Sequence, residues 1–278
     1  MIIQRLVRTN GIELNVAEEG EGPVVVLLHG FPHTWQVWSE VIGPLARNHR
    51  VLAPDLRGFG DSLGTPDRAA PLDAATIAAD IEGLLDETTA TVVAIDAAVP
   101  AAFLLGLNRP ELVTRLVLIE STLGRLPGAE DFFAAGPPWW FGFHAVPGLA
   151  ETVLAGHEAE YVGWFYDQGT RNRGVRPDIR AAIGAAYARP GALRSALSFY
   201  RGLHRTAEQL RDAVRTRRLA VPTTTIGAAP VGRALEQQLR PITDDLTAHL
   251  IPGCGHIVPL DRPHELLAAM PWSAATPH

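Results

Sequence analysis

Short, continuous runs of β-forming apolar residues recur four times in the first 120 positions of the chain, at 24–28, 50–54, 91–95 and 115–119. Strands that are buried on both faces of a parallel sheet have this pattern. Helical patterns separate the runs, near 34–47, 73–88 and 97–108. An alternation of this kind predicts an α/β fold, with a mostly parallel sheet flanked by helices.

The alternation stops between residues 121 and 205, where Gly and Pro punctuate helical stretches that are dense in aromatic residues. It resumes afterwards with the runs "VPTTTI" and "LTAHLI", and a hairpin around Asn10-Gly11 opens the chain. We therefore predict an eight-stranded core formed by residues 1–120 and 206–278, with residues 121–205 inserted as a helical cap.

Composition excludes several classes of function. A formal net charge of −6 argues against nucleic acid as a partner, since a protein that tracks phosphates needs a basic face. The single Cys254 rules out a disulfide framework. No apolar run approaches the ~18 residues that span a bilayer, and the first residues do not read as a signal peptide. We expect a cytoplasmic protein that does not bind membranes, without a metal or cofactor.

The most informative position is Asp96, where the apolar run "TVVAI" ends and small helix-forming residues follow in "DAAVPAA". A carboxylate at this point is typical of a helix N-cap, which needs no chemistry. The alternative is a nucleophile elbow, in which a sharp strand-to-helix turn presents a reactive side chain between small residues. Here Ala94 and Ala98 occupy the small positions, and Asp96 stands at the nucleophile position.

Two further segments favour the elbow. In "LLHGFPHTWQVW", a predicted strand ends in His29-Gly30, so the amide of Phe31 can point into a cleft and form an oxyanion hole with the amide of Ala97. In "IPGCGHIVP", His256 follows a predicted strand within a Gly-rich turn, a setting that suits a catalytic base.

The acid that orients His256 is expected at Glu120, which ends the apolar run "RLVLIE" and is costly to bury without a partner. The loop after "VPTTTI" holds no carboxylate, because none occurs between Asp212 and Glu236. Asp244 and Asp245 are the fallback candidates. Nucleophile, acid and histidine then follow one another in the chain order of α/β-hydrolases.

The chain resembles the α/β-hydrolase superfamily nearly from end to end. The resemblance rests on the segments "HGFPHTWQVW", "DLRGFGDS", the elbow, "RLVLIE" and "GCGHIVP". Within the superfamily, the Asp nucleophile resembles the epoxide hydrolase and haloalkane dehalogenase branch. The elbow differs from the usual G-H-D-W-G-G of that branch, since it reads A-I-D-A-A-V. The resemblance implies that Asp96 forms an alkyl ester with the substrate, which water activated by His256 hydrolyses to a vicinal diol.

The resemblance also places a ring-opening donor at Tyr200 in the late cap. Its partner is expected in "PPWWFGFHAVPG", either at Trp139 and Trp140 or at His144. Haloalkane dehalogenation is the alternative reaction, but the halide donors usual in that branch are replaced by Phe31 and Ala97. A degenerate hydrolase that only binds ligands is a third possibility, favoured by the missing elbow glycines.

The predicted substrate pocket is rich in aromatic residues, which indicates a bulky and aromatic or natural-product epoxide. Some relatives of this type act in aromatic polyketide biosynthesis, which extends the expectation to such a pathway. The sequence leaves open whether the protein forms a homodimer. The pocket residues, apart from those named as catalytic, are Trp35, Phe141, Phe143, His144, Trp164, Phe165, Phe199 and Ile257.

Overall fold

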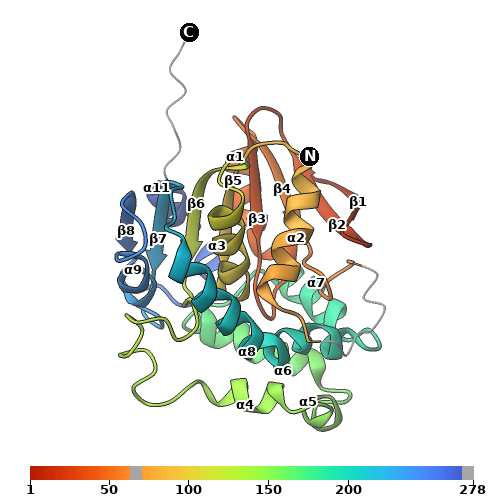
Figure 1. Cartoon of the computed structure of the whole chain (residues 1–278). Coiled ribbons are helices and arrows are strands. Elements are labelled where there is room, and N and C mark those ends of the chain that lie inside the picture. The colour runs from red at the N-terminus through yellow and green to blue at the C-terminus, as the bar shows by residue number, and fades with distance from the viewer. Residues whose placement is uncertain (63–70, 271–278) are drawn as a thin grey trace.

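The computed structural model describes residues 1–62 and 71–270. Within these ranges eight strands form one sheet in the order β1-β2-β4-β3-β5-β6-β7-β8, which confirms the predicted fold (Figure 1). The strands are β1 (Ile3–Thr9), β2 (Ile12–Glu19), β3 (Val24–Leu28), β4 (Arg50–Pro54), β5 (Ala90–Ile95), β6 (Val113–Ile119), β7 (Thr223–Gly227) and β8 (Leu246–Leu250).

Strand direction follows the sequence pattern. The antiparallel pair β1 and β2 is joined by Asn10 and Gly11, whose φ angles of 42° and 77° suit a two-residue hairpin turn. Strand β2 is also antiparallel to β4, whereas the remaining neighbours run parallel. The five residues of β3 are all buried, as expected for a strand covered on both faces.

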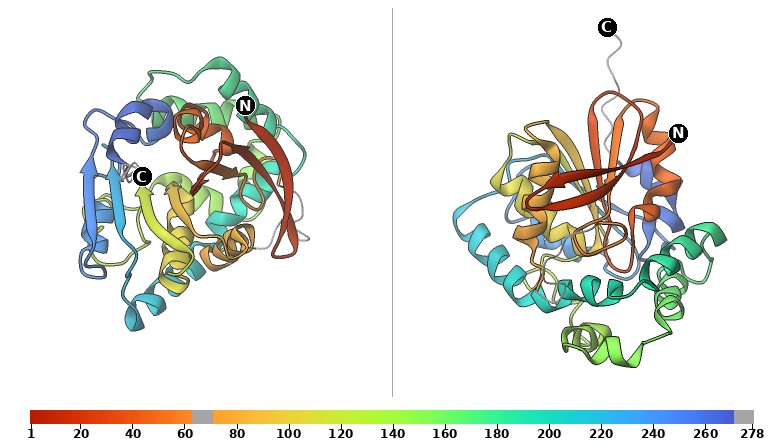
Figure 2. Two further views of the ribbon diagram at one scale, coloured as in Figure 1. Left: turned by 90° about the horizontal axis from the view of Figure 1, so that it is seen from above. Right: turned by 90° about the vertical axis from the view of Figure 1, so that its right-hand side faces the viewer.

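Helices cover both faces of the sheet. Helices α1 (Ser39–Ala46), α10 (Val258–Asp261) and α11 (Pro263–Ala269) contact one another on one face, and α2 (Ala74–Leu85) and α3 (Val99–Asn108) pack together on the other (Figure 2). The short helix α9 (Ala234–Leu239) contacts β7. In the described ranges, no helix is both long and apolar enough to cross a membrane.

Between β6 and β7 the chain forms helices that lie below the carboxyl ends of the strands in the view of Figure 1. They are α4 (Trp139–Ala145), α5 (Leu149–Val153), α6 (Glu158–Gly169), α7 (Pro177–Tyr187) and α8 (Ala192–Thr216). This helical insertion has no strands, as the sequence indicates. The cap boundary that we place at residue 205 falls inside α8, so one helix continues from the cap onto the core.

Helix α8 is held against the core by backbone contacts. The Leu72 amide donates to the Ser198 carbonyl at 3.0 Å, and the Ala74 amide donates to Thr206 Oγ1 at 3.1 Å. At Gly202 the helix comes so close that a Cβ atom would lie 2.0 Å from the Leu72 carbonyl oxygen. Glycine at this position therefore sets the distance between α8 and the core.

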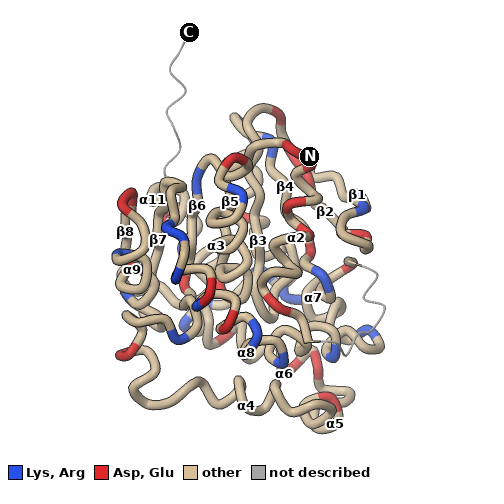
Figure 3. Tube along the Cα trace, viewed as in Figure 1, with Lys and Arg blue, Asp and Glu red and all other residues tan. Residues whose placement is uncertain are grey.

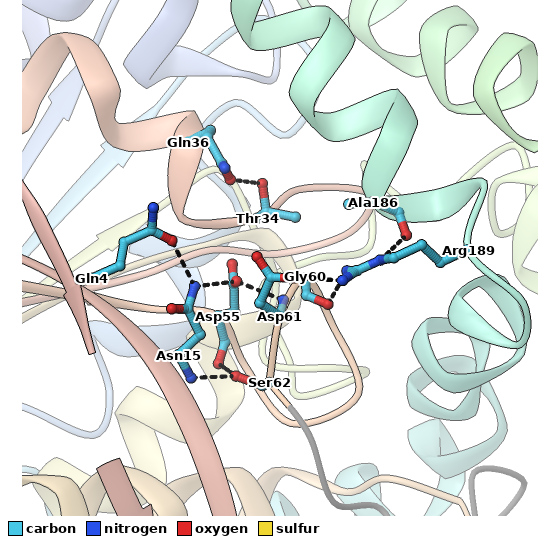
Figure 4. Close-up of polar contacts among 10 residues, drawn as sticks. All are labelled: Gln4, Asn15, Thr34, Gln36, Asp55, Gly60, Asp61, Ser62, Ala186 and Arg189. Carbon is cyan, nitrogen blue, oxygen red and sulfur yellow. Dashed lines mark hydrogen bonds and ion pairs between the residues drawn. The ribbon is translucent and has the colours of Figure 1, made fainter. Parts of the chain in front are cut away.

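A second link joins the cap to the loop after β4. Asp55 holds this loop by accepting from the Trp35 amide at 2.8 Å, from Asn15 Nδ2 at 2.9 Å and from the Asp61 amide at 2.9 Å. Arg189, from the connection between α7 and α8, donates to the Asp61 carboxylate and to a backbone carbonyl beside it (Figure 4). The segment "DLRGFGDS" thus links the core to the connection between α7 and α8.

Candidate active site

Asp96 lies where β5 ends and a single 3-10 turn leads into α3. Its φ angle is 53°, a left-handed conformation that costs free energy for a residue with a side chain. The opposing loop comes very close, since a Cβ atom on Gly30 would lie 2.3 Å from Asp96 Oδ2. The turn therefore presents the carboxylate in a strained conformation, which a plain N-cap does not require.

The carboxylate of Asp96 is held by backbone amides. The Phe31 amide donates to Asp96 Oδ2 at 2.8 Å. The Ala97 amide is a second hydrogen-bond donor to the same carboxylate. These are the two amides that the sequence indicates for an oxyanion hole. The Phe31 amide binds Oδ2, whereas Oδ1 lies on the side of His256.

His256 approaches Asp96 from the loop after β8. Its Nε2 lies 3.5 Å from Asp96 Oδ1, and its Nδ1 donates to Glu120 Oε2 at 3.3 Å. The cap holds this loop, because the Ile257 amide donates to the Gly169 carbonyl at the end of α6, at 2.9 Å. The imidazole therefore bridges the two carboxylates, and its position depends on the cap.

Glu120 occupies the turn after β6 with a φ angle of 44° and a fully buried side chain. Its Oε1 accepts from the Ala228 amide, in the loop after β7. The carboxylate thus reaches across from its own strand to the neighbouring loop that lacks an acid. Asp244, one of the fallback candidates, instead pairs with Arg218 at 2.7 Å and is exposed.

The three charges stabilise one another. Burial alone would lower the pKa of His256, but hydrogen bonds and charge interactions with Asp96 and Glu120 outweigh it and raise the pKa to about 10. Burial alone would raise the pKa of Asp96, but His256 and the Ala97 amide hold it below its ordinary value. The resting site therefore contains an imidazolium between two carboxylates.

Tyr200 lies on α8 and lines the same cavity as Asp96. Burial, followed by the charge of Asp96, keeps the pKa of Tyr200 well above its ordinary value, so the phenol stays protonated. A hydrogen-bonding interaction with Trp140 acts in the opposite direction. Trp139 is 57% exposed, and its ring packs against Trp140, Phe143 and Trp164 on the outside of the cap. Only the second tryptophan of the pair approaches the phenol.

His144 is fully buried, with its ring centroid 4.4 Å from that of Tyr200. Its Nε2 forms a 2.6 Å hydrogen bond with the Tyr161 hydroxyl. Burial and, secondarily, the charge of Arg201 lower the pKa of His144 to about 4. At neutral pH the imidazole is uncharged, so it does not supply the acid that the sequence left open at this position.

The other residues predicted for the pocket lie in several different places. The Phe31 ring packs edge-on against Phe165, His144 and Tyr200 above the nucleophile. Trp35 and Ile257 are buried in the main core. Trp164 is 39% exposed on the outer face of α6, and Phe143 packs between Trp139 and Tyr161. Of the predicted pocket residues outside the catalytic set, two line the cavity at Asp96, namely Phe141 and Phe199.

That cavity has a volume of about 550 Å³ and runs from Asp96 along α8. Much of its lining comes from positions that the sequence reasoning missed, in the segment after β6 and on the second half of α8. The periodicity of α8 was the available signal, because residues three, four and seven positions after Tyr200 share its face. The missed positions are Pro100, Ser121, Thr122, Gly124, Arg125, Leu126, Phe133, Pro137, Leu203, His204, Thr206, Ala207, Glu208 and Arg211.

No group of three or more His, Cys, Asp or Glu side chains is placed to hold a metal ion in the part of the chain that the structure describes. Cys254 is buried beside the His256 loop, where burial raises the pKa of its thiol to about 12. This cysteine is a neutral packing residue at physiological pH.

The chain is similar to known proteins along most of its length. Residues 25–269 match the model of the alpha/beta hydrolase family. The soluble epoxide hydrolase of Corynebacterium sp. (strain C12) is 26% identical over 275 residues, which cover 91% of each chain. A laboratory-evolved variant of potato epoxide hydrolase superimposes with a TM-score of 0.82 at 25% identity, over 96% of this chain and 97% of that one. Cfl2 of Burkholderia cenocepacia gives a TM-score of 0.84 at 28% identity, over 95% and 93%.

Proposed function

The chain belongs to the alpha/beta hydrolase family, and from the geometry of its site we propose that it is an epoxide hydrolase with Asp96 as its nucleophile. The observation that carries the proposal is the setting of Asp96. One oxygen of its carboxylate faces His256, and the other accepts from the Phe31 amide. The similarity to epoxide hydrolases along nearly the whole chain supports the same reaction.

In the first step, Asp96 Oδ1 attacks a carbon of the epoxide and the carbon–oxygen bond of the ring breaks. The electron pair goes to the ring oxygen, which takes the proton of the Tyr200 hydroxyl. Tyr200 then recovers a proton from His256, whose imidazolium holds one in the resting site. The products of this step are a hydroxyalkyl ester on Asp96 and a neutral imidazole.

Ester formation prepares the second step, because it removes the negative charge of Asp96 that raises the pKa of His256. The neutral imidazole takes a proton from water, and the resulting hydroxide attacks the ester carbonyl carbon. The amides of Phe31 and Ala97 stabilise the oxyanion, each contributing about 2.7–4 kcal/mol. Collapse breaks the bond between the former ester carbon and the substrate oxygen, and the leaving alkoxide takes the proton of the carboxylic acid that forms on Asp96. The diol leaves, and the site again holds an imidazolium between the carboxylates of Asp96 and Glu120.

The epoxide is favoured over a halide by the donors near the nucleophile. An opening epoxide needs a proton, which the Tyr200 phenol can give, whereas a halide leaves without one. The indole of Trp140 interacts with Tyr200, so we assign it to orienting the phenol. The cavity, with a volume of about 550 Å³, leaves room for a bulky substrate. A role in aromatic polyketide biosynthesis remains an expectation from the sequence. The same holds for the formation of a homodimer.

The direct test is to trap the ester. His256→Gln removes the base, so incubation with an aryl epoxide should leave a hydroxyalkyl adduct on the peptide that contains Asp96, measured by mass spectrometry after digestion. The same variant treated with an alkyl bromide should stay unmodified. An adduct from the bromide alone would assign haloalkane dehalogenation instead.

Two controls make the result specific. Asp96→Ala in the His256→Gln background should abolish the adduct, because it removes the attacking oxygen. In the unsubstituted protein, a single turnover in ¹⁸O-labelled water should place the label in the Asp96 carboxylate and leave the first diol unlabelled. Label in that diol would mean direct attack by water and would contradict the ester mechanism.

A further inference from the structure

His256 lies in the loop between β8 and α10, and the backbone amides on either side of it are both held. The Gly255 amide donates to Asp261 Oδ2 at 2.6 Å. The Ile257 amide donates to the Gly169 carbonyl, at the end of α6, at 2.9 Å. One of these anchors belongs to the core and the other to the helical insertion. The position of the imidazole therefore depends on two contacts that its own side chain does not make.

Arg173, in the turn after α6, joins the two anchors. Its Nε donates to Asp261 Oδ1 at 2.5 Å, and its Nη2 donates to the other oxygen of the same carboxylate. The same Nη2 donates to the Gly253 carbonyl at 2.9 Å, within the loop itself. The guanidinium thus binds the loop directly, and it also fixes the carboxylate that holds the amide before His256.

Burial distinguishes the ion pair of Arg173 and Asp261 from an ordinary surface contact. Basic and acidic positions are spread over the core and the helical insertion (Figure 3), and pairs between exposed side chains contribute little. The Asp261 side chain, in contrast, is fully buried. Burial alone would raise the pKa of Asp261, but Arg173 and the Gly255 amide hold it below its ordinary value. Loss of the guanidinium would leave a buried carboxylate without its cation, which is strongly unfavourable.

Close packing joins the loop to the end of α6. A Cβ atom on Gly255 would lie 2.2 Å from the Gly169 carbonyl oxygen, and a Cβ atom on Gly169 would lie 2.5 Å from a side-chain carbon of Ile257. The backbones are therefore in contact around the hydrogen bond that links them. A shift of the turn after α6 would move the loop, and His256 with it.

We propose that Arg173 and Asp261 are positioning residues for His256, through which the helical insertion holds the base in place for ester hydrolysis. This inference rests on the proposed epoxide hydrolysis and concerns its second step. In that step the imidazole must reach a water at the ester carbonyl, whereas ester formation depends on Asp96 and Tyr200. A displaced imidazole should therefore slow hydrolysis of the ester and spare its formation.

The test measures the two steps separately. After rapid mixing with styrene oxide and acid quenching, mass spectrometry of the intact protein gives the rates at which the Asp96 ester forms and disappears. Arg173→Gln should slow hydrolysis of the ester about 10- to 100-fold and leave its formation within about threefold, because a misplacement of about 1 Å is enough to cost 10²-fold. The ester should accumulate, so kcat and KM should fall together and kcat/KM should change little.

A conservative variant and a matched control make the result specific. Arg173→Lys should restore part of the rate, because an ammonium group still pairs with Asp261 but lacks the planar fork that binds both carboxylate oxygens. In the control, Arg180→Gln, the guanidinium that is removed pairs with both oxygens of Asp167 inside the helical insertion. The Arg180 side chain is 41% exposed, against 36% for Arg173. Both rates should stay nearly unchanged in this control.

The kinetic outcome that contradicts the inference is clear. Equal losses in ester formation and ester hydrolysis in Arg173→Gln would indicate a general structural effect and would overturn it. No change in either rate would overturn it as well. Both results would leave epoxide hydrolysis through Asp96 intact.

Hydrogen exchange tests the loop without any substrate. In the unsubstituted protein the Gly255 and Ile257 amides should be protected, because both are hydrogen-bonded. Arg173→Gln should increase exchange in peptides that cover residues 251–260, measured by mass spectrometry, and Arg180→Gln should not. If this protection is lost in Arg173→Gln but the unsubstituted protein hydrolyses no epoxide, the proposed function fails and the role of Arg173 in holding the loop stands. Unchanged exchange in Arg173→Gln would overturn that role.

Discussion

Glu120 is one of the two carboxylates that hold the imidazole of His256. It accepts from His256 Nδ1 at 3.3 Å, and its other oxygen is fixed by the Ala228 amide. The buried carboxylate thereby orients the imidazole with Nε2 toward Asp96. In the proposed mechanism it would also stabilise the positive charge that forms when His256 deprotonates water, which is the role of the acid in a Ser-His-Asp triad.

Replacing Glu120 by Gln should therefore slow ester hydrolysis much more than ester formation. We expect kcat to fall about 10²- to 10⁴-fold, with accumulation of the Asp96 ester measurable by rapid quenching and mass spectrometry. Asp244→Asn is the control, since that exposed residue pairs with Arg218, and it should be nearly neutral. Equal loss in both variants would remove Glu120 from the site.

The stability of the protein should respond to pH through His256. Its pKa rises from an ordinary value near 6.5 to about 10 on folding, so its contribution to the free energy of unfolding is complete below about pH 6.5. The contribution declines as the pH rises and is lost through about pH 10. The Tm of the unsubstituted protein should therefore approach that of His256→Gln between pH 7 and 10.

The control for this measurement is His249→Gln, which replaces an exposed histidine on β8. It gives the effect on the Tm of replacing a surface histidine, against which the pH dependence of His256→Gln is compared. A constant difference in Tm between the unsubstituted protein and His256→Gln across this range would contradict a protonated histidine in the resting site.

Among the helices and strands, α8 is the one that carries Tyr200 from the cap to the cavity at Asp96. Tyr200 is in its third turn, and Gly202 lies two residues later where the helix touches the Leu72 carbonyl. Any change in this contact moves the phenol relative to Asp96. In the proposed mechanism the helix therefore supports Tyr200 as the ring-opening donor, and its residues also line the cavity at Asp96.

Gly202→Ala should displace α8, because the added Cβ would lie 2.0 Å from a backbone oxygen. We expect a loss of about 1–3 kcal/mol in the free energy of unfolding and a lower kcat. Gly142→Ala, on α4, is the control, as nothing lies within 4 Å of its added Cβ. Urea unfolding and steady-state assays measure both effects. Unchanged stability in Gly202→Ala would show that the contact does not set the position of α8.

For the whole molecule, cap and core share contacts that make separate folding unfavourable. Helix α8 packs against α2, α3 and α4, and Arg189 ties the α7–α8 connection to the loop after β4. The His256 loop is in turn hydrogen-bonded to the end of α6 through Ile257 and Gly169. We propose that residues 121–205 form a cap that is continuous with the core through α8.

This continuity predicts a single unfolding transition in urea. Tryptophan fluorescence, which includes Trp139, Trp140 and Trp164 of the cap, should coincide with far-UV circular dichroism, which is dominated by the helices and strands of the entire chain. The two curves should give the same midpoint and m-value. A fluorescence transition at lower urea would mean that the cap unfolds first.

The strand runs and the site motifs were readable from the sequence because each depends on local order along the chain. Continuous apolar runs specify buried strands, and a polar residue directly after such a run lies at the carboxyl edge of the sheet. Asp96, Glu120 and His256 each follow a strand, so a parallel sheet brings them to one edge. The amides of Phe31 and Ala97 follow for the same reason.

Side-chain direction in the cap is decided by tertiary structure. Trp139 and Trp140 are adjacent and chemically identical, yet packing turns the first to the surface and brings the second to Tyr200. His144 is neutral because of its burial, which no local pattern reveals.

The α/β fold was predictable from hydrophobic periodicity, and Asp96 and His256 could be predicted as nucleophile and base because each residue follows a strand. That α8 extends past the expected cap boundary, and that its second half lines the cavity at Asp96, could not be predicted in this way. The physical reason is that a pocket is lined by segments far apart in the chain. Which of their side chains meet depends on how closely the helices pack, as at Gly202.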